Sequence, residues 1–152
     1  MATRSTSSAR GARDELAIGW REWARLPDLC EFPIKAKIDT GAQTSVIDAF
    51  DVEETERAGV PMASFRLYPD DRGEMEGPFC EAPICDRRAV KSSNGVTQER
   101  IVIRTTLALG RRSWPIELSL ADRSEMNFRM LIGREALAGV IIHPQASFLL
   151  GE

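Results

Sequence analysis

The sequence contains few of the residues that build disulfide frameworks and metal sites. It has three cysteines and one histidine among 152 residues. An odd number of cysteines argues against a disulfide framework, so we expect Cys30, Cys80 and Cys85 to be free thiols in a reducing compartment. The single histidine, His143, has no partner at a zinc-ligand spacing. We therefore expect no metal and no cofactor.

Long hydrophobic runs are also missing from the sequence. The longest apolar run, residues 136–142, is far shorter than a membrane span, and the N-terminus lacks the apolar core of a signal peptide. A net charge of −3 requires neither a nucleic acid nor a membrane as a partner. These observations predict a cytoplasmic protein with no nucleic-acid partner and no membrane partner.

The length of 152 residues predicts one domain with a single hydrophobic core. Residues 1–13 are small, polar and basic and contain almost nothing to bury, so we expect a disordered N-terminal tail. The remaining residues, 14–152, are expected to form the folded domain.

Period-two alternation of apolar residues dominates the rest of the chain. Alternation along residues 101–109 resumes at 114–120, which indicates two strands joined as a hairpin. Further strands are expected at 16–23, 34–39, 45–49, 65–68 and 147–150, a short helix at 134–138 and a weak helical turn at 52–58. Short strands at close spacing predict a small all-β barrel or sandwich.

A polar hairpin tip is predicted within residues 88–102. Asn94-Gly95 is a strong signal for a two-residue turn because both residue types tolerate positive φ. The arms beside it carry mostly charged, hydroxyl and amide side chains, so the tip cannot be core. It is either an exposed loop or a mobile flap that closes over a ligand.

The motif Asp39-Thr40-Gly41 places an acid where an apolar-alternating strand ends. Ala42 follows the motif, and a second apolar segment that ends in glycine, Leu131-Ile132-Gly133, comes late in the chain. An aspartate in such a place can be an ordinary turn-former or cap. Its sequence context favours a functional role.

The order of these motifs resembles that of the retropepsin-like aspartic proteases, with DTGA first, then a polar hairpin with a glycine tip, then LIGR. More narrowly, the sequence is similar to a bacterial family labelled ATP-dependent zinc proteases. The similarity covers nearly all of residues 16–150 and includes the segments IGWREW, IKAKIDTGAQTS, KSSNG, IVIRTTLALG, ADRSEM and MLIGREAL. The resemblance implies an all-β fold over residues 14–152, a small closed acid-protease (retropepsin-like) barrel with a flap hairpin and one short C-terminal helix.

The resemblance also implies an aspartic mechanism, in which two neighbouring carboxylates share one proton. The ionised group takes a proton from the attacking water, and the protonated group hydrogen-bonds the scissile carbonyl. This chain has a single Asp-Thr-Gly motif, so the second Asp39 is expected from the other chain of a homodimer, across a two-fold axis. Thr40 would brace the paired loops, Gly41 would permit close backbone approach, and Ile132-Gly133 would pack behind the catalytic loop.

Cationic side chains are expected to line the substrate cleft. Residues two apart on a strand share a face, so Lys35 and Lys37 should point the same way as Asp39. Positions matching Lys37 and Arg129 are typically apolar in viral relatives, and cations there favour an acidic substrate. The alternative is that both are solvated edge charges. The substrate-binding residues are expected to be Lys37, Ala42, Ser92, Ser93, Asn94, Gly95, Arg129 and Leu131.

The bacterial family is associated with ATP-grasp ligases that append glutamate, which implies a glutamate-rich peptide or isopeptide as substrate. The leading hypothesis is therefore a homodimeric aspartic peptidase with a functional link to such a ligase. The rival hypothesis is a catalytically inactive module that binds acidic peptides or a partner enzyme. A third hypothesis is metal-assisted hydrolysis.

Overall fold

The computed structural model describes residues 15–68, 77–91, 95–123 and 127–151. Strands make up almost all of the regular structure, which confirms the expected all-β fold. The strands are β1 (Leu16–Ile18), β2 (Arg21–Ala24), β3 (Ile34–Asp39), β4 (Ser45–Asp48), β5 (Phe50–Arg57), β6 (Val60–Arg66), β7 (Phe79–Lys91), β8 (Thr97–Leu109), β9 (Arg112–Ala121), β10 (Met130–Gly133) and β11 (Val140–Ile142), and a 3-10 turn, η1, covers Arg134–Ala136.

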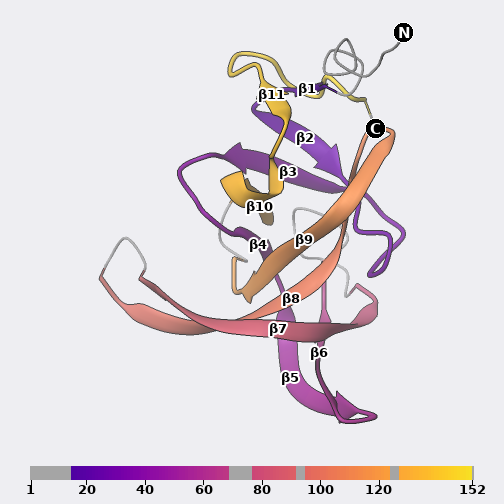
Figure 1. The fold of residues 1–152 in the computed structure, drawn as a ribbon, viewed down its shortest axis with the longest axis vertical. Helices are drawn as coiled ribbons and strands as arrows, with labels where there is room; N and C mark the ends of the chain where they lie inside the picture. The colour runs from indigo at the N-terminus through magenta and orange to yellow at the C-terminus, as the bar shows by residue number, and fades with distance from the viewer. Residues whose placement is uncertain (1–14, 69–76, 92–94, 124–126, 152) are drawn as a thin grey trace, which may run out of the picture.

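Nine strands form one sheet in the order β2-β3-β10-β4-β9-β8-β7-β6-β5, and β1 pairs with β11 in a separate two-stranded sheet. In Figure 1, β1 and β11 lie at one end of the molecule, β7 and β8 sweep across the other half, and the β5–β6 hairpin projects beyond them. β10 runs parallel to β3 and antiparallel to β4, so it lies between the strands on either side of residues 40–44.

The sheet curls toward a ring without closing. Beyond the end of β2, Arg25 exchanges two backbone hydrogen bonds with Ala108 of β8, at 3.0 and 2.9 Å. The chain then turns away, because Leu29 N–H donates to the Leu26 carbonyl oxygen at 2.9 Å. Among the described residues no longer pairing joins β2 to β8. The prediction of a closed barrel is therefore wrong in its closure, and the sheet is open with β2 and β5 as its edges.

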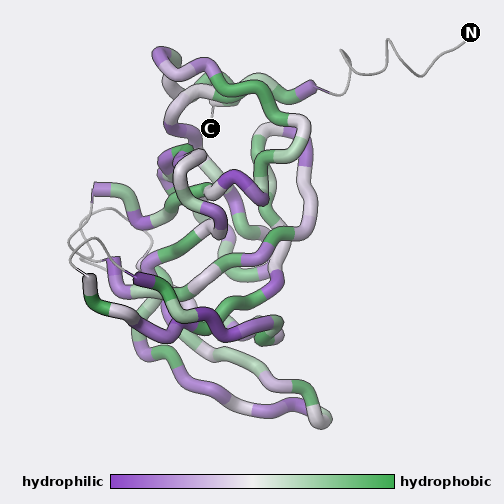
Figure 2. The backbone as a smooth tube through the Cα atoms, turned by 60° about the vertical axis from the view of Figure 1, so that its left-hand side comes forward, coloured by the Kyte–Doolittle hydropathy of each residue, from purple (hydrophilic) through white to green (hydrophobic). Residues whose placement is uncertain are grey.

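Alternation of apolar residues builds the core. Ile34, Ala36 and Ile38 of β3 are buried, and burial of each isoleucine side chain contributes about 1.5–3 kcal/mol. β8 and β9 follow the same pattern and form the hairpin predicted from residues 101–109 and 114–120. Figure 2 shows hydrophobic segments gathered in the body of the molecule, whereas one arm of the projecting hairpin is mostly hydrophilic.

The strand predicted at residues 16–23 is interrupted at Gly19. A Cβ at this position would lie 2.3 Å from the Ala146 carbonyl oxygen, so no other residue fits without a backbone shift. The next amide, Trp20 N–H, donates to the same oxygen at 2.8 Å. The chain consequently divides into β1, which pairs with β11, and β2, which pairs with β3.

The helical turn predicted at residues 52–58 is wrong, because this segment belongs to β5. Ala58 and Gly59 adopt φ values of 52° and 82° and reverse the chain in two residues, as a tight hairpin requires. β5 and β6 therefore pair antiparallel. The strand predicted at 65–68 overlaps the end of β6, which begins at Val60.

The helix predicted at residues 134–138 is a single 3-10 turn. Leu137 N–H donates to the Arg134 carbonyl oxygen at 3.1 Å, and the Trp114 indole N–H donates to the Ala136 carbonyl oxygen at 3.0 Å. Because an aromatic side chain satisfies this carbonyl group, the turn does not need to continue as a helix.

The strand predicted at residues 147–150 is instead a turn region with one isolated bridge, from Ser147 to β2. The amides of Leu149 and Leu150 donate to the Glu22 carboxylate, at 2.9 and 3.2 Å. The Glu22 carboxylate thus accepts the hydrogen bonds that carbonyl groups of a neighbouring strand would otherwise accept.

β7 and β8 form the predicted polar hairpin, and Figure 1 shows it extending away from the body. Lys91 and Thr97 form the last described pair before the tip. Gly95 has the expected positive φ, 87°. Ser92, Ser93 and Asn94 lie outside the described residues, as does the predicted tail at 1–13. The described part of the chain holds no helix with the length and apolarity to cross a membrane.

Candidate functional site

Asp39 is the last residue of β3, at the edge where the parallel strands β3 and β10 end together. The register places Gly133 beside Asp39. Ile38 is buried in the core, so alternation turns Asp39 to the opposite side, where it is half-buried. The strands predicted at 34–39 and 45–49 correspond to β3 and β4, and they hold the two ends of residues 40–44, called here the Asp39 loop.

The first turn of the Asp39 loop fixes the direction of the carboxylate. Asp39 Oδ1 accepts a hydrogen bond from Gly41 N–H at 3.1 Å, and the Asp39 carbonyl oxygen accepts one from Ala42 N–H at 3.1 Å. Thr40 and Gly41 are exposed, and Ala42 is half-buried. The backbone therefore orients the carboxylate while leaving it open to solvent, as contact with a substrate requires.

Backbone groups just after β10 hold the Asp39 loop from behind. Arg134 N–H donates to the Ala42 carbonyl oxygen at 2.8 Å, and Glu135 N–H donates to the Gln43 carbonyl oxygen at 3.1 Å. The predicted packing of the Ile132-Gly133 segment behind the loop is therefore present in the structure.

Gly133 is the point of closest approach between β10 and the Asp39 loop. A Cβ on it would lie 2.8 Å from the Thr44 carbonyl carbon and 2.9 Å from the carbonyl oxygens of Ala42 and Gln43. Gly133 N–H also donates to Ser45 Oγ at 3.0 Å. The two segments can contact each other directly because this residue has no side chain.

The Arg134 side chain adds a second connection, which the sequence did not assign. Its Nη1 lies 3.3 Å from the Gly41 carbonyl oxygen and 3.5 Å from the Thr40 carbonyl oxygen. The available signal was the arginine directly after Gly133 in LIGR, which sequence reasoning took as the start of a helix. The role expected for Thr40, bracing paired loops, concerns two chains and stays a prediction.

Lys35, Lys37 and Asp39 share one side of β3, as the alternation predicted. Lys37 is exposed, and Lys35 Nζ lies 5.5 Å from the centroid of the Phe128 ring. Leu131 pairs in register with Lys37 and is half-buried on β10. These predicted substrate-binding residues therefore lie on the strands that end at the Asp39 loop.

Arg129 is buried, so the alternative interpretation of it as a solvated edge charge is wrong. Its Nη1 donates to the Asp48 carboxylate, and its guanidinium carbon lies 4.3 Å from the centroid of the Tyr68 ring. Only 7% of the Arg129 side chain and 2% of the Asp48 side chain are exposed. Removing one partner of such a pair leaves an uncompensated buried charge, which costs about 3–5 kcal/mol. Asp48 therefore already compensates the charge of Arg129.

Arg123 is a further cation that the sequence did not single out. Its N–H donates to Asp48 Oδ1 at 2.7 Å, and its Nε–H donates to the Phe128 carbonyl oxygen at 3.1 Å. Burial lowers the pKa of the Arg123 guanidinium; Asp48 and Asp39 act against this shift, and the charge of Arg100 adds to it. Arg123 thus lies within electrostatic reach of Asp39. The fold creates this proximity, because Arg123 belongs to no recognisable motif.

Arg88 of β7 connects the β7–β8 hairpin to the Asp39 loop. Its Nη1 donates to Thr44 Oγ1 at 3.0 Å, its Nη2 donates to Glu117, and its Nε donates to Asp86. Gly95, near the hairpin tip, is exposed. Arg88 therefore holds this part of the hairpin against the Asp39 loop.

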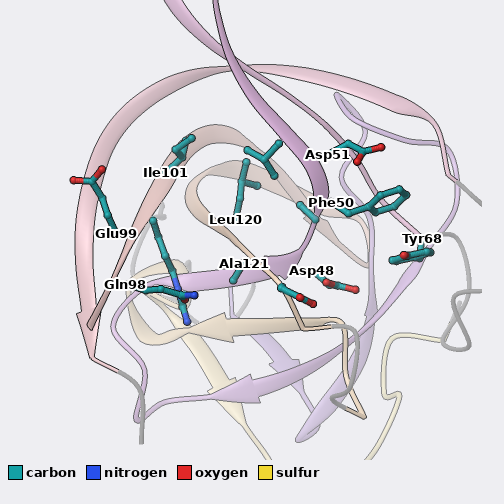
Figure 3. Close-up of a pocket in the computed structure, with 13 residues that line it drawn as sticks. Asp48, Phe50, Asp51, Tyr68, Gln98, Glu99, Ile101, Leu120 and Ala121 are labelled. Carbon is teal, nitrogen blue, oxygen red and sulfur yellow. The ribbon is translucent and has the colours of Figure 1, made fainter. Parts of the chain in front are cut away.

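A cavity of about 450 Å³ opens between the end of β4, the start of β5, and strands β8 and β9. Phe50 and Tyr68, whose ring centroids are 4.4 Å apart, lie together at one end of it (Figure 3). Asp51, also in the lining, adopts φ 53°, an uncommon conformation for a residue with a side chain. The volume is within the range of small-molecule and side-chain pockets.

The three cysteines are free, as predicted. Cys30 and Cys80 are buried and Cys85 is exposed, and burial raises the pKa of the Cys80 thiol to about 11. In the part of the chain that the structure describes, no three or more histidine, cysteine, aspartate or glutamate side chains gather as metal ligands would.

A family model described as RimB-like, retropepsin-like aspartic endopeptidase RimB, matches residues 17–149 of this chain. A solved structure of Lpg0085, a protein of unknown function from Legionella pneumophila, matches with a TM-score of 0.77 at 23% identity, covering 89% of this chain and 98% of that one. This likeness shows a shared fold.

Curated relatives named probable alpha-L-glutamate ligase are also similar in sequence. The one from Shewanella pealeana is 41% identical over 140 residues, and the one from Parasynechococcus marenigrum is 40% identical over 139 residues. Both alignments cover 91% of this chain but only 31% and 30% of the relative. The chain therefore spans about a third of the length of the curated relatives it matches.

Proposed function

Because the chain belongs to the RimB-like family of retropepsin-like aspartic endopeptidases, we propose that it is a peptide hydrolase whose two catalytic carboxylates are the Asp39 side chains of a homodimer. The observation that carries this proposal is the position of Asp39. Its carboxylate ends a core strand, is oriented by Gly41 N–H, and stays accessible to solvent in a loop that β10 supports.

The homodimer follows from the need for a second carboxylate. Within the described residues Asp39 forms no ion pair, and its recorded side-chain hydrogen bond is the one from Gly41. A two-fold axis that passes beside the Asp39 loop brings two copies of Asp39 together, since such an axis makes identical residues face each other. Thr40 would brace the paired loops, and the β7–β8 hairpin would act as the flap.

The chemistry of such a pair requires one shared proton. The ionised Asp39 removes a proton from water while the water oxygen forms a bond to the scissile carbonyl carbon. The other Asp39, still protonated, donates to the carbonyl oxygen. The C–N bond then breaks, and the leaving nitrogen takes up a proton. The proton balance needs no group beyond the two aspartates, the water and the peptide.

The proposed substrate is an acidic peptide. Lys37 stands two residues before Asp39 on the same side of β3, where it would favour carboxylate side chains. The names of the relatives support glutamate as the acidic residue and support a functional link to an ATP-grasp ligase. A peptidase that removes residues added by a ligase would share its compartment, so a cytoplasmic location is part of the proposal.

Replacement of Asp39 tests the proposal. We expect Asp39→Asn to lower kcat for hydrolysis of a glutamate-rich peptide by roughly 10²- to 10⁴-fold, because the amide cannot accept the proton of the attacking water. Mass spectrometry of the peptide after incubation at several pH values measures cleavage. Asp28→Asn, which alters an exposed acid, is the matched control and should retain full activity.

The same experiment separates the rival hypotheses. If Asp39→Asn binds the peptide but does not cleave it, the peptidase proposal is supported. A wild-type protein that binds acidic peptides and leaves them intact at every pH would instead favour the inactive binding module. Loss of wild-type activity on addition of a chelator would favour metal-assisted hydrolysis.

A further inference from the structure

Arg100 on β8 carries a charge that the described structure leaves without a partner. The residue is half-buried and lines the cavity beside β4 and β9. Its Nε is buried and has no hydrogen-bond partner, and no ion pair among the described residues includes Arg100. Burial of an unsatisfied donor costs about 1–3 kcal/mol, and more for a charged group. A group with this cost is expected to have a ligand.

The neighbours of Arg100 increase the cost. Arg100 pairs in register with Arg88 across β7 and β8, which sets two cations side by side on one face of the hairpin. Arg88 is compensated, because its guanidinium donates to Asp86 and Glu117. Arg123 is a third cation close enough to interact with Arg100. Among these three arginines, Arg100 is the one with a buried Nε that lacks a hydrogen-bond partner.

The site of this charge is next to the Asp39 loop. Arg88, directly opposite Arg100, donates to Thr44 of that loop at 3.0 Å. Arg123 interacts electrostatically with both Arg100 and Asp39. The register with Arg88 therefore places Arg100 beside a residue that contacts the Asp39 loop.

No ion pair among the described residues joins Arg100 to the acidic residues of the cavity lining, which are Asp48, Asp51, Glu99 and Asp122. The Asp48 carboxylate is bound by Arg129 and by the Arg123 amide. Figure 3 shows Glu99 turned away from the other labelled lining side chains. The stacked rings of Phe50 and Tyr68 give the cavity an apolar wall, against which the methylene groups of a longer side chain can pack.

We infer that this cavity is a carboxylate-binding subsite, in which Arg100 holds an acidic side chain of the substrate beside Asp39. The Nε–H and one Nη–H of a guanidinium form a planar pair of donors that matches the two oxygens of a carboxylate. Binding would provide the missing acceptor for Nε–H and offset the repulsion from Arg88. The inference rests on the proposed peptidase function and adds the residue that selects the substrate.

Paired peptides that differ only by glutamate or glutamine at one position test the subsite. For the position that occupies the cavity, Arg100→Gln is expected to lower kcat/KM for the glutamate peptide by roughly 10- to 100-fold and to leave the glutamine peptide nearly unchanged. Arg100→Lys should restore only part of the preference, because lysine keeps the charge but lacks the paired donors. Arg104→Gln, which removes an exposed cation of the same strand, is the control and should keep the full preference.

A binding measurement separates failure of the subsite from failure of the proposed function. In an Asp39→Asn background, calorimetry with hexaglutamate should give a Kd roughly 10- to 100-fold higher for Arg100→Gln than for Arg104→Gln. Weaker binding together with an inert wild type would retain the subsite and overturn the peptidase. Cleavage by the wild type with an unchanged glutamate preference in folded Arg100→Gln and Arg100→Lys would overturn the subsite, as would a preference for basic peptides.

Discussion

Gly133 is the residue on which the support of the Asp39 loop depends most directly. We expect Gly133→Ala to destabilise the fold by about 1–3 kcal/mol, because the added methyl group overlaps the backbone of residues 42–44 and forces strand and loop apart. The same displacement would move the Asp39 carboxylate and reduce cleavage. Urea unfolding gives the free energy of unfolding, and peptide hydrolysis gives the activity.

Gly59→Ala is the matched control for this prediction. Gly59 lies in the turn of the β5–β6 hairpin and has positive φ, with open space around it. Its replacement by alanine therefore strains the backbone without a steric clash. Gly59→Ala should lower stability modestly and leave kcat unchanged in the folded protein. Equal activity losses in the two variants would contradict the role given to Gly133.

At the residue scale, positions on strands could be predicted from the sequence, and ion pairs could not. Period two was enough to place Asp39 and Lys37 on one side of β3. The buried pair of Arg129 and Asp48 joins residues 81 positions apart, so no local pattern reveals it. The substrate-binding role predicted for Arg129 therefore falls on a side chain that already has a buried acidic partner.

At the scale of elements, the Glu22 side chain connects β2 to Gly19, which precedes it, and to the C-terminal segment at residues 149–150. Its carboxylate accepts hydrogen bonds from the amides of Gly19, Leu149 and Leu150, at 2.7, 2.9 and 3.2 Å. Glu22 is fully buried, so water cannot replace these bonds. We expect Glu22→Gln to cost about 1–3 kcal/mol, because its amide N–H₂ must face a backbone donor.

Hydrogen exchange read by mass spectrometry checks this prediction. Exchange in residues 147–151 should become faster in Glu22→Gln, whereas the β8–β9 hairpin should keep its protection. Glu31→Gln, at an exposed acid, should leave both regions unchanged. Uniform acceleration over the whole chain would mean that Glu22 stabilises the fold globally instead of anchoring the C-terminal segment.

The elements that the sequence failed to predict depend on features that a local residue pattern does not show. Segment 52–58 has the composition of a solvated helix, and its pairing with β6 depends on the positive φ of Ala58, which no propensity indicates. Residues 147–150 alternate like a strand, yet the buried Glu22 takes their amides. The long, regularly alternating strands were predictable because burial of one face determines them.

At the scale of the whole molecule, the proposed shared active site makes a prediction about mixtures. When wild type is allowed to exchange subunits with a tenfold excess of Asp39→Asn, random pairing leaves roughly a tenth of the wild-type chains in wild-type dimers. Activity per wild-type chain should fall to about that fraction, because a mixed dimer has one catalytic carboxylate. Peptide hydrolysis before and after exchange measures the effect.

An unchanged activity after exchange would mean that each chain acts alone. In the exchange experiment, an equal mass of an unrelated protein in place of Asp39→Asn controls for crowding. Sedimentation over a range of protein concentrations identifies the oligomer directly. The homodimer stays a prediction, made from the sequence because a single Asp-Thr-Gly motif needs a counterpart. The open sheet could not be predicted from the sequence, since closure fails at the turn after Arg25.

The free edge at β5 has a consequence for how copies of the protein meet in a crowded solution. An unpaired strand offers its amide and carbonyl groups to any stray strand, which is a common start of fibrous aggregation. Along β5 the exposed carboxylates of Glu53 and Glu56 would meet their own counterparts in an approaching copy. Their mutual repulsion opposes pairing of β5 with β5 of another copy, so the open sheet does not need a further element to cover this edge.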